Sequence, residues 1–243
     1  MMLAALQPGY LPWLGFFEQA HRADLFLVCD ELNYEKYSWR NRNRIKTSNG
    51  AGWLTVPVEK TGVNQKAIKD VRIDYGRDWG RKHWLSLRRF YGNAPFFGDH
   101  AGYLETVYKK RYELLAELDR ELIIYLLSAV GIKTKVVFQS DLGLEEKFQR
   151  TAGRDATDRL VFFCREFGAE AFYEGAAGKN YIDETRVREA GIDLIYQDYV
   201  HPVYPQLHGE FIPYLSVVDL LFNCGNESLD ILAGRRSALP ADR

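Results

Sequence analysis

The beginning of the chain places a strand, a loop, a helix and a second strand in immediate succession, and this order strongly restricts the fold. Residues 3–6 predict a short strand, and the loop 7–12 contains two prolines and a glycine that exclude regular structure. Apolar residues recur at helical spacing over 13–23, and residues 25–29 form an apolar run. Two strands joined by a helix are usually parallel. We therefore expect a parallel sheet that binds ligands at the carboxyl ends of its strands.

The rest of the chain extends this pattern. Residues 34–58 predict a β-hairpin with a turn at 48–50, and the last third alternates helices with strands, which is typical of a mostly parallel sheet. The further elements expected are helices over 79–91, 103–131, 155–167, 183–189 and 215–223 and strands over 136–139, 171–174 and 193–196. The polar segment 140–154 is expected to be a mobile linker or lid.

The predicted fold class is α/β: a mostly parallel, Rossmann-like sheet flanked by helices, with a β-hairpin and a helical insertion. We expect a single domain over 1–233, with the insertion around 79–131, and a flexible tail over 234–243.

Composition limits the classes of function. The 243 residues include 32 Lys and Arg against 33 Asp and Glu, a net charge of −1. Such a chain has no general attraction to DNA or to an acidic membrane, so anion binding must be local. No apolar stretch reaches the roughly 20 residues of a membrane span, and no signal peptide is recognisable. A cytoplasmic protein without a membrane partner is expected.

Metal binding is not expected from the cysteines and histidines. Cys29, Cys164 and Cys224 lie far apart among apolar neighbours, which predicts reduced, buried thiols. The five histidines have no metal-ligand spacing. No cofactor motif is recognised either.

The sharpest local motif is the basic run at 40–46. Side chains of an extended chain alternate between two faces. One face is expected to carry Arg40, Arg42, Arg44 and Lys46, and the other Trp39, Asn41, Asn43 and Ile45. Four like charges repel unless the face is solvated or an anion binds there, and arginine suits two-pronged binding of phosphate or carboxylate. A solvated hairpin face and an anion site both fit this pattern.

The loop that starts at Gln7 leads into a helix amino terminus, where unpaired N–H groups favour anions. A rigid aromatic plug built from Tyr10 and Trp13 fits the same residues. A strand, a proline-containing turn and a helix also resemble nucleotidyltransferases, but the two histidines of that turn are absent here.

Polar residues at other predicted element ends are candidates for chemistry. Asp30 and Glu174 each follow an apolar strand, and His201 begins a Pro- and Tyr-rich loop, so each is a candidate acid or base. Gly175 begins a loop whose glycines either let the backbone approach a ligand closely or simply join a strand to a helix. Along an otherwise apolar helix, Ser216, Asp219 and Asn223 recur on one face, where they either orient site groups or bond a neighbouring loop.

Several motifs together resemble one family in order and spacing from Gln7 to about Gly225. They are Gln7-Pro8 with Tyr10 to Gly15, Asp30, Trp39 to Lys46, Trp53 to Val58, Tyr173 to Gly175 with Tyr181, Tyr204 with Gln206, and Ser216 with Asp219 to Gly225. This pattern resembles the WbqC-like protein family. Where members of that family tend to carry a serine before the glycine of the Tyr173 motif, this chain has Glu174.

The resemblance implies a role among bacterial genes for O-antigen and other surface polysaccharides or secondary metabolites. It implies transfer of a glycyl or other aminoacyl group to an amine of a sugar or comparable intermediate, forming an amide. In this hypothesis Asp30, Glu174 or His201 takes the proton from the amine, and Gln7 and Asn41 donate hydrogen bonds to the oxyanion. The acyl donor is an aminoacyl adenylate, a carrier thioester or an aminoacyl-tRNA, and the net charge does not favour tRNA.

Residues expected to bind a small anionic substrate, such as a nucleotide-sugar or an activated amino acid, come from the same motifs. They are Tyr10, Trp13, Trp39, Asn41, Arg42, Arg44, Lys46, Gly175, Tyr181, Tyr204, Gln206, Ser216, Asp219 and Asn223. Two alternatives are a nucleotidyltransferase-like enzyme and a non-catalytic nucleotide-sugar-binding protein.

Overall fold

A computed structural model describes residues 1–235, and these residues form two compact units that are treated separately below. Unit 1 comprises Met1–Gln7, Glu18–Glu31 and Lys133–Val200. Unit 2 comprises Pro8–Phe17, Leu32–Ile132 and the described residues from His201 onward. The expected single domain over 1–233 stays a prediction, and most of the expected tail, 236–243, lies outside the described residues.

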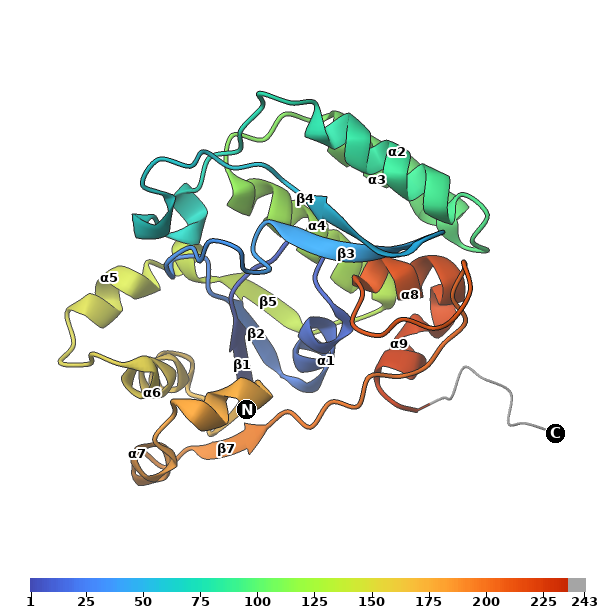
Figure 1. Ribbon diagram of the computed structural model, residues 1–243. Helices are drawn as coiled ribbons and strands as arrows, with labels where there is room; N and C mark the ends of the chain where they lie inside the picture. Colours follow the sequence, from blue (N-terminus) through green and yellow to red (C-terminus); the bar gives the residue numbers. More distant parts are fainter. Residues whose placement is uncertain (236–243) are drawn as a thin grey trace. The chain divides into compact units, whose positions relative to one another are not determined.

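Unit 1 is built on a five-stranded parallel sheet with the order β5-β2-β1-β6-β7 (Figure 1). The strands are β1 (Met2–Leu6), β2 (Leu25–Val28), β5 (Lys135–Phe138), β6 (Ala171–Glu174) and β7 (Asp193–Tyr196). All four residues of β2 are buried, as expected for an inner strand of a parallel sheet that is covered on both faces. The predicted α/β class with a mostly parallel sheet is confirmed.

The helical elements of unit 1 follow the strands along the chain. They are α5 (Leu144–Gln149), α6 (Ala156–Phe167), α7 (Glu184–Glu189) and the short 3-10 turns η3 (Gln139–Leu142) and η4 (Ala176–Asn180). Helix α1 (Leu14–Arg22) begins among residues of unit 2 and ends among those of unit 1. Asp155 and Asp183 start α6 and α7 as side-chain caps, each accepting a backbone N–H of the first turn.

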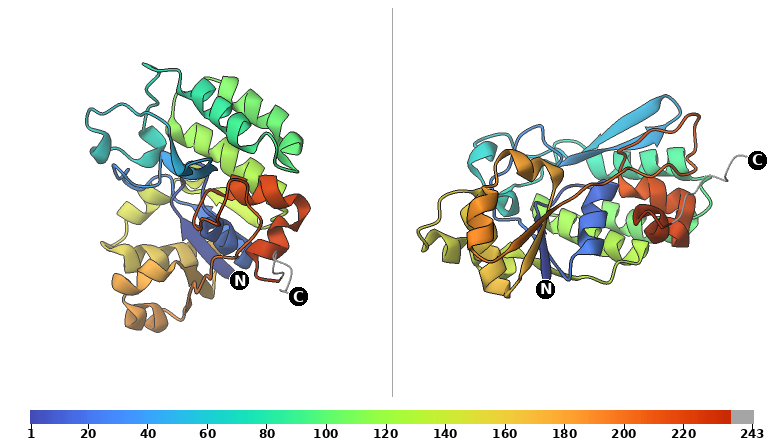
Figure 2. Two further views of the ribbon diagram at one scale, coloured as in Figure 1. Left: turned by 45° about the vertical axis from the view of Figure 1, so that its right-hand side comes forward. Right: turned by 90° about the horizontal axis from the view of Figure 1, so that it is seen from below.

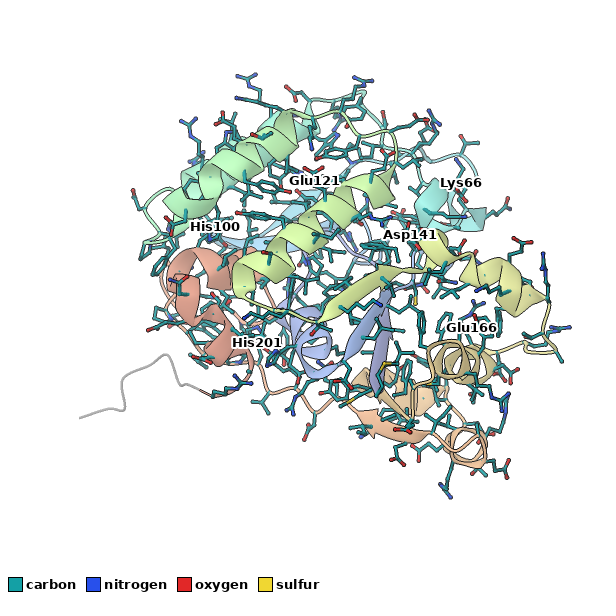
Figure 3. The ribbon with its side chains drawn as sticks, turned by 180° about the vertical axis from the view of Figure 1, so that it is seen from behind. Lys66, His100, Glu121, Asp141, Glu166 and His201 are labelled. Carbon is teal, nitrogen blue, oxygen red and sulfur yellow. The ribbon has the colours of Figure 1, made fainter. Side chains whose placement is uncertain are left out.

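The segment 140–154, expected to be a mobile linker or lid, contains η3 and α5 over most of its length, and its mobility stays a prediction. Hydrogen bonds to Asp30 and Glu31 and an ion pair with α6 hold these two elements in place. The backbone N–H and the hydroxyl of Ser140 both donate to Asp30, and the N–H of Glu145 donates to Glu31. Lys147 on α5 also pairs with Glu166 on α6, a residue labelled in Figure 3.

Unit 2 contains the predicted antiparallel hairpin, whose two strands run side by side in Figure 2. Strand β3 (Arg42–Thr47) pairs with β4 (Gly50–Thr55), and Arg44 lies opposite Trp53. Gly50 has a φ of 99°, a left-handed conformation that costs glycine little and closes the tight turn. The second strand thus starts earlier than the β-rich sequence at 53–58 indicates.

The helices of unit 2 are α2 (Trp79–Tyr91), α3 (Phe97–Lys109), α4 (Leu115–Val130), α8 (Val217–Cys224) and α9 (Ser228–Leu232). Three 3-10 turns accompany them: η1 (Val63–Gln65), η2 (Ile68–Asp70) and η5 (Gly225–Glu227). Helix α2 has the predicted bounds, and Gly131 closes α4 with a φ of 94°, as expected of a helix-ending glycine.

The single helix expected over 103–131 is wrong, because the chain leaves the helix after Lys109 and re-enters it at Leu115. The carboxylate of Glu117 accepts the N–H groups of Glu113 and Leu114 and caps the second helix. The intervening residues also pair with residues 71–73 by backbone hydrogen bonds. Pairing with a distant segment therefore overrides a continuous helical pattern.

No helix within residues 1–235 combines the length and the apolar character that a membrane crossing needs. Cys29, Cys164 and Cys224 are buried free thiols, as predicted.

Candidate functional sites

The order of the strands creates a topological switch point in unit 1. Strands β2 and β5 follow β1 in the chain and lie on one side of it within the sheet. Strands β6 and β7 lie on the other side of β1. Ligands of open parallel sheets bind beyond the carboxyl ends of the strands at such a reversal. Gln7 follows β1 and Glu174 ends β6, and the pairing of Ala4 with Tyr173 brings these strand ends to neighbouring levels. The reversal therefore gives Gln7 and Glu174 the position where a ligand is expected.

Glu174 has the protonation behaviour of a proton-transfer group. Burial raises the pKa of its carboxyl to about 7, against the opposing effects of the Tyr181 hydroxyl and the Gly175 N–H. The Tyr181 hydroxyl donates to the carboxylate at 3.3 Å, and burial raises the pKa of Tyr181 to about 12, so this hydroxyl stays protonated. Three residues singled out from the sequence, Glu174, Gly175 and Tyr181, thus lie together. A carboxyl with a pKa near 7 both accepts and returns a proton at neutral pH.

Asp30 lies at the carboxyl end of β2 but is engaged with its own chain. One carboxylate oxygen accepts the Ser140 N–H at 2.9 Å and the other accepts the Ser140 hydroxyl at 2.6 Å. Burial raises the pKa of Asp30, and both hydrogen bonds from Ser140 act against that rise. In this arrangement Asp30 ties the end of β2 to the turn after β5. Its role as a catalytic base stays a prediction.

An arginine that the sequence motifs did not single out reaches the same edge of the sheet. Arg159 on α6 pairs with Glu145 on α5, and its guanidinium lies 4.2 Å from the ring centre of Phe148. The charges of Arg159, Asp30, Glu174 and Glu145 all act on the pKa of the buried Cys29 thiol, which burial raises strongly. Asp30 lies closest to this thiol in the chain, and Arg159 and Glu145 form an ion pair between α5 and α6. Arg159 and Glu145 belong to separate helices, so no local spacing indicates their pairing.

A second feature missed in the sequence is a buried polar cluster formed by Glu18, Gln19, Tyr173 and Gln197. The Glu18 carboxylate accepts from the Tyr173 hydroxyl at 3.2 Å and from Gln197 Nε2 at 2.6 Å. Gln19 Nε2 donates to Gln197 Oε1 at 2.9 Å. A Cβ on Gly175 would lie 3.2 Å from Gln19 Nε2, so the cluster is packed against the loop after β6. The sequence signal that could have indicated this cluster is the pair Glu18 and Gln19, two polar residues next to the apolar stripe of α1.

The first loop and the basic run contact each other in unit 2, and the acceptors of these hydrogen bonds are backbone carbonyls. Tyr10 N–H donates to the Arg40 carbonyl, and Arg40 Nη1 donates to the Pro8 carbonyl at 3.1 Å. Asn43 Nδ2 donates to the Leu11 carbonyl at 2.7 Å. Asn41 Nδ2 likewise donates to a carbonyl, that of Val56, at 2.7 Å. The amides of the run therefore fix the loop and the strand, and the oxyanion role of Asn41 stays a prediction.

The expected alternation along β3 is confirmed for its inner face and only partly for the cations. Asn41, Asn43 and Ile45 are buried, whereas Arg42 and Arg44 are half-buried on the other face. Trp39 was expected on the same face as Asn41, Asn43 and Ile45, but it lies outside the strand, which starts only at Arg42. Its exposed ring lies 5.2 Å from that of Trp53, on the side of the arginines.

Aromatic rings lie next to both arginines on this face. The Arg42 guanidinium lies 4.5 Å from the ring centre of Trp53. The Arg44 guanidinium lies 5.7 Å from the ring centre of Trp39 and 5.9 Å from that of Trp53. Cations over an aromatic face are attracted to its electron-rich centre. No ion pair joins Arg42 or Arg44 to a carboxylate within residues 1–235.

A pocket of about 500 Å³ opens beside Arg42 in unit 2. Its lining includes four cations, Lys36, Arg42, Lys60 and Arg77, and a single carboxylate, Asp74. The aromatic rings of Tyr34 and Tyr37 and the side chain of Asn41 also line it. Of the predicted binding residues, Asn41 and Arg42 therefore share a basic, partly aromatic pocket.

Lys46, the last cation of the run, is not on an accessible face: it is 0% exposed. Its ammonium donates to Gln206 Oε1 at 3.0 Å and to the carbonyl of Glu210. Gln206 Nε2 donates to Asp219 at 2.7 Å, and Asp219 also accepts the Tyr91 hydroxyl at 2.7 Å. Burial lowers the pKa of Lys46 and raises that of Asp219, so each charge depends on the other polar groups of the network.

The remaining predicted residues of α8 and its preceding loop surround this network. Ser216 caps α8 by accepting the Val218 N–H, and Asn223 Nδ2 donates to the Asp219 carbonyl at 2.7 Å. Tyr204 is almost fully buried, and burial together with the charge of Asp219 raises its pKa. Their substrate-binding role stays a prediction, and in this structure they order the polar interior of unit 2.

His201, labelled in Figure 3, is held by its own loop. Its Nδ1 lies 2.9 Å from the Pro202 carbonyl and its Nε2 accepts the Tyr214 N–H at 3.0 Å. Burial lowers the pKa of His201, which fits a neutral ring with the proton on Nδ1. Both ring nitrogens are therefore engaged, and a catalytic role for His201 stays a prediction.

The two aromatic residues of the first loop also lie in unit 2. Tyr10 is fully buried, with its hydroxyl 2.9 Å from His83 Nδ1 and 2.5 Å from the Tyr108 hydroxyl. Trp13 lies 5.9 Å from the ring of Tyr214 and against Gly15. Of the two interpretations of this loop, an anion site and a rigid aromatic plug, the burial of Tyr10 fits the plug.

In the part of the chain that the structure describes, no group of three or more His, Cys, Asp or Glu side chains is arranged to hold a metal ion.

Comparisons with known proteins identify the family. The model of the WbqC-like protein family matches residues 7–231. The "Uncharacterized protein Rv1507c" of Mycobacterium tuberculosis is 36% identical over 232 residues, which cover 95% of this chain and 96% of that protein. No solved structure gives a significant match. The match of almost the whole chain, together with the motifs from Gln7 to Gly225, shows that the chain belongs to the WbqC-like protein family.

Proposed function

We propose that the chain is a cytoplasmic transferase that joins a glycyl or other aminoacyl group to an amine of a sugar or another biosynthetic intermediate. The proposed setting is surface polysaccharide or secondary-metabolite biosynthesis. The observation that carries the proposal is Glu174, a carboxyl with a pKa of about 7 at the carboxyl end of β6, beside the reversal of the sheet. Proton transfer is the chemistry for which such a group is suited.

The proposed reaction needs this group because the nitrogen of an attacking amine must give up a proton before a neutral amide is formed. The amine nitrogen forms a bond to the acyl carbon, and the bond from that carbon to the leaving group breaks. Glu174 takes the proton from the nitrogen and returns it to the leaving group. Tyr181 positions the carboxylate, and Gln7, at the end of the neighbouring strand, is the proposed hydrogen-bond donor to the oxyanion.

The proposed substrate is small and anionic, and unit 2 carries cationic side chains suited to it. Arg42 and Arg44 lie on the aromatic face of β3 with no carboxylate partner within the described residues. The acyl donor is one of three classes: an aminoacyl adenylate, a carrier thioester or an aminoacyl-tRNA. A direct assay with each class distinguishes them.

The test incubates purified protein with an amino-sugar nucleotide and glycyl adenylate, a glycyl thioester or glycyl-tRNA, and detects the amide by mass spectrometry. We expect product with one donor class and a loss of about 100-fold or more in rate for Glu174→Gln, the usual range for a lost general base. Glu189→Gln, an exposed carboxylate at the end of α7, is the matched control. Absence of amide with all three donors, or full activity of Glu174→Gln, contradicts the proposal. Release of pyrophosphate from a nucleoside triphosphate with magnesium would instead indicate a nucleotidyltransferase.

A further inference from the structure

We propose that the pocket lined by Lys36, Arg42, Lys60 and Arg77 binds the diphosphate of a nucleoside diphosphate, with its nucleoside against Tyr37. The inference rests on the proposed function for one premise, that the substrate is a small anionic molecule. It adds the chemical class of that substrate and the residues that recognise it.

The charge of the pocket is the first argument. Four cations line it against the single carboxylate of Asp74, which already accepts the Gly76 N–H at 2.8 Å. Within residues 1–235 none of the four cations forms an ion pair with a carboxylate. Like charges gathered around a cavity repel one another, and a multiply charged anion relieves that repulsion. A diphosphate offers several oxygens for such groups, whereas a lone carboxylate offers two.

The hydrogen-bond donors of the pocket are the second argument. Arg42 donates from Nε to the Ser38 carbonyl and from Nη2 to the Tyr37 carbonyl, which fixes the guanidinium and leaves further N–H groups for a ligand. Burial raises the pKa of Tyr34 to about 12, so its hydroxyl stays protonated and is able to donate to an anion. Fixed donors bind an anion at a low cost in conformational entropy.

The backbone at Tyr37 is the third argument. Tyr37 has a φ of 68°, a left-handed conformation that is unfavourable for a residue with a Cβ. The residue is nevertheless 72% exposed, so burial of its side chain does not explain this backbone conformation. The ring lines the pocket, with the Lys36 ammonium 5.1 Å from its centre. An exposed ring beside a cationic pocket offers a stacking surface for a base.

Size and overall charge favour a nucleotide over RNA. A volume of about 500 Å³ lies within the usual range of small-molecule sites. RNA binding draws on a broad basic surface, and the net charge of this chain is −1.

Calorimetric titration of the full chain with UDP, ADP, inorganic pyrophosphate and uridine tests the inference. We expect UDP or ADP to bind and pyrophosphate to bind more weakly, with no binding of uridine. Lys60→Ala and Arg77→Ala should each weaken nucleotide and pyrophosphate binding by about 10-fold, and added salt should weaken it further. Lys82→Ala and Arg81→Ala are matched controls, because both residues are exposed on α2 outside the pocket lining.

A further variant separates the base from the diphosphate. Tyr37→Gly removes the ring and leaves the left-handed backbone unstrained, so the pocket backbone is kept. We expect nucleotide binding to fall by about 10-fold, the size of one lost stacking contact, and pyrophosphate binding to stay unchanged. Tyr37→Phe should bind like the unmodified chain.

Three results would overturn the inference. In the first, neither UDP nor ADP binds. In the second, a nucleotide binds, but Lys60→Ala and Arg77→Ala leave its affinity unchanged. In the third, tRNA binds and nucleotides do not, and the two variants weaken the binding of tRNA. Failure of the proposed function alone gives a different result. In that case nucleotide still binds and Lys60→Ala and Arg77→Ala still weaken its binding, but no amide forms. Conversely, amide formation that depends on Glu174 without nucleotide binding would refute the inference alone.

Discussion

The Tyr181 hydroxyl donates to the Glu174 carboxylate across a loop of six residues that leaves the end of β6 and returns to it. Gly178 permits this return, because a Cβ at that position would lie 2.3 Å from Glu174 Cγ. The same loop leaves Glu174 half-buried, and burial raises its pKa to about 7. One strand end thus holds a carboxyl that changes charge near neutral pH, together with a donor that stabilises the charged form.

The stability of the chain should depend on pH through Glu174. Its pKa is about 7 in the folded chain against an ordinary value of 4.5, so between these values the unfolded chain loses the proton and the folded chain keeps it. Stability attributable to this group therefore falls as pH rises from about 4.5 to 7. Glu174→Gln should be more stable than the unmodified chain at pH 8 by on the order of 2 kcal/mol, with little difference from protonated Glu at pH 4.5.

Urea unfolding at the two pH values measures this difference, with Glu189→Gln as the control. Tyr181→Phe should raise the pKa of Glu174 further, because the lost hydrogen bond favours the charged form. An equal effect of Glu174→Gln at both pH values would show that the carboxyl titrates normally.

Glu18 should contribute strongly to the stability of unit 1. Its almost fully buried carboxylate accepts from Tyr173, Gln197 and Arg22, so Glu18→Ala leaves buried donors without an acceptor. We expect a loss of about 2–4 kcal/mol in the free energy of unfolding, measured with urea. Glu189→Ala should change it by about 0.5 kcal/mol or less. A similar small effect for Glu18→Ala would mean that solvent reaches the cluster.

The buried ammonium of Lys46 should be required for the network around Asp219. Lys46→Met fills a similar volume but leaves Gln206 Oε1 and the Glu210 carbonyl without this donor. We expect a loss of about 3 kcal/mol in the free energy of unfolding, as for other broken buried charge networks. Lys82→Met, at an exposed position of α2, is the control. If both variants unfold at the same urea concentration, the network contributes nothing to stability.

Gly15 should tolerate no side chain while Trp13 is present. A Cβ at Gly15 would lie 2.2 Å from Cη2 of the indole, although alanine in a helix is intrinsically favoured over glycine by about 1 kcal/mol. We expect Gly15→Ala to destabilise the chain by about 1–3 kcal/mol, as overpacking usually does. In a double-mutant cycle, Trp13→Ala should remove most of that cost. Additive effects of the two substitutions would contradict the contact.

The elements predicted well are those whose pattern is local. The apolar runs that became β6 and β7, and the helical period of α2, lie within one element each, so their own residues suffice to specify them. The alternation of Asn41, Asn43 and Ile45 along the hairpin is local in the same sense. Likewise, Glu174 was predicted at a strand end because its position follows from the neighbouring apolar residues.

The errors arose where distant residues decide the conformation or the environment. Glu117 and the segment 71–73 interrupt the helical pattern at 110–114. The burial of Lys46 follows from a loop 160 residues further along the chain. No local pattern encodes these contacts.

The order of apolar and polar residues was therefore enough to specify the α/β class, the parallel strands, the hairpin and the strand end that carries Glu174. Three-dimensional packing decided the raised pKa of Glu174, the pairing of Arg159 with Glu145 and the gathering of Lys60 and Arg77 around Arg42. The physical reason is that a pKa and a pocket depend on desolvation and on charges brought close by folding. Neither quantity is a property of residues adjacent in the chain.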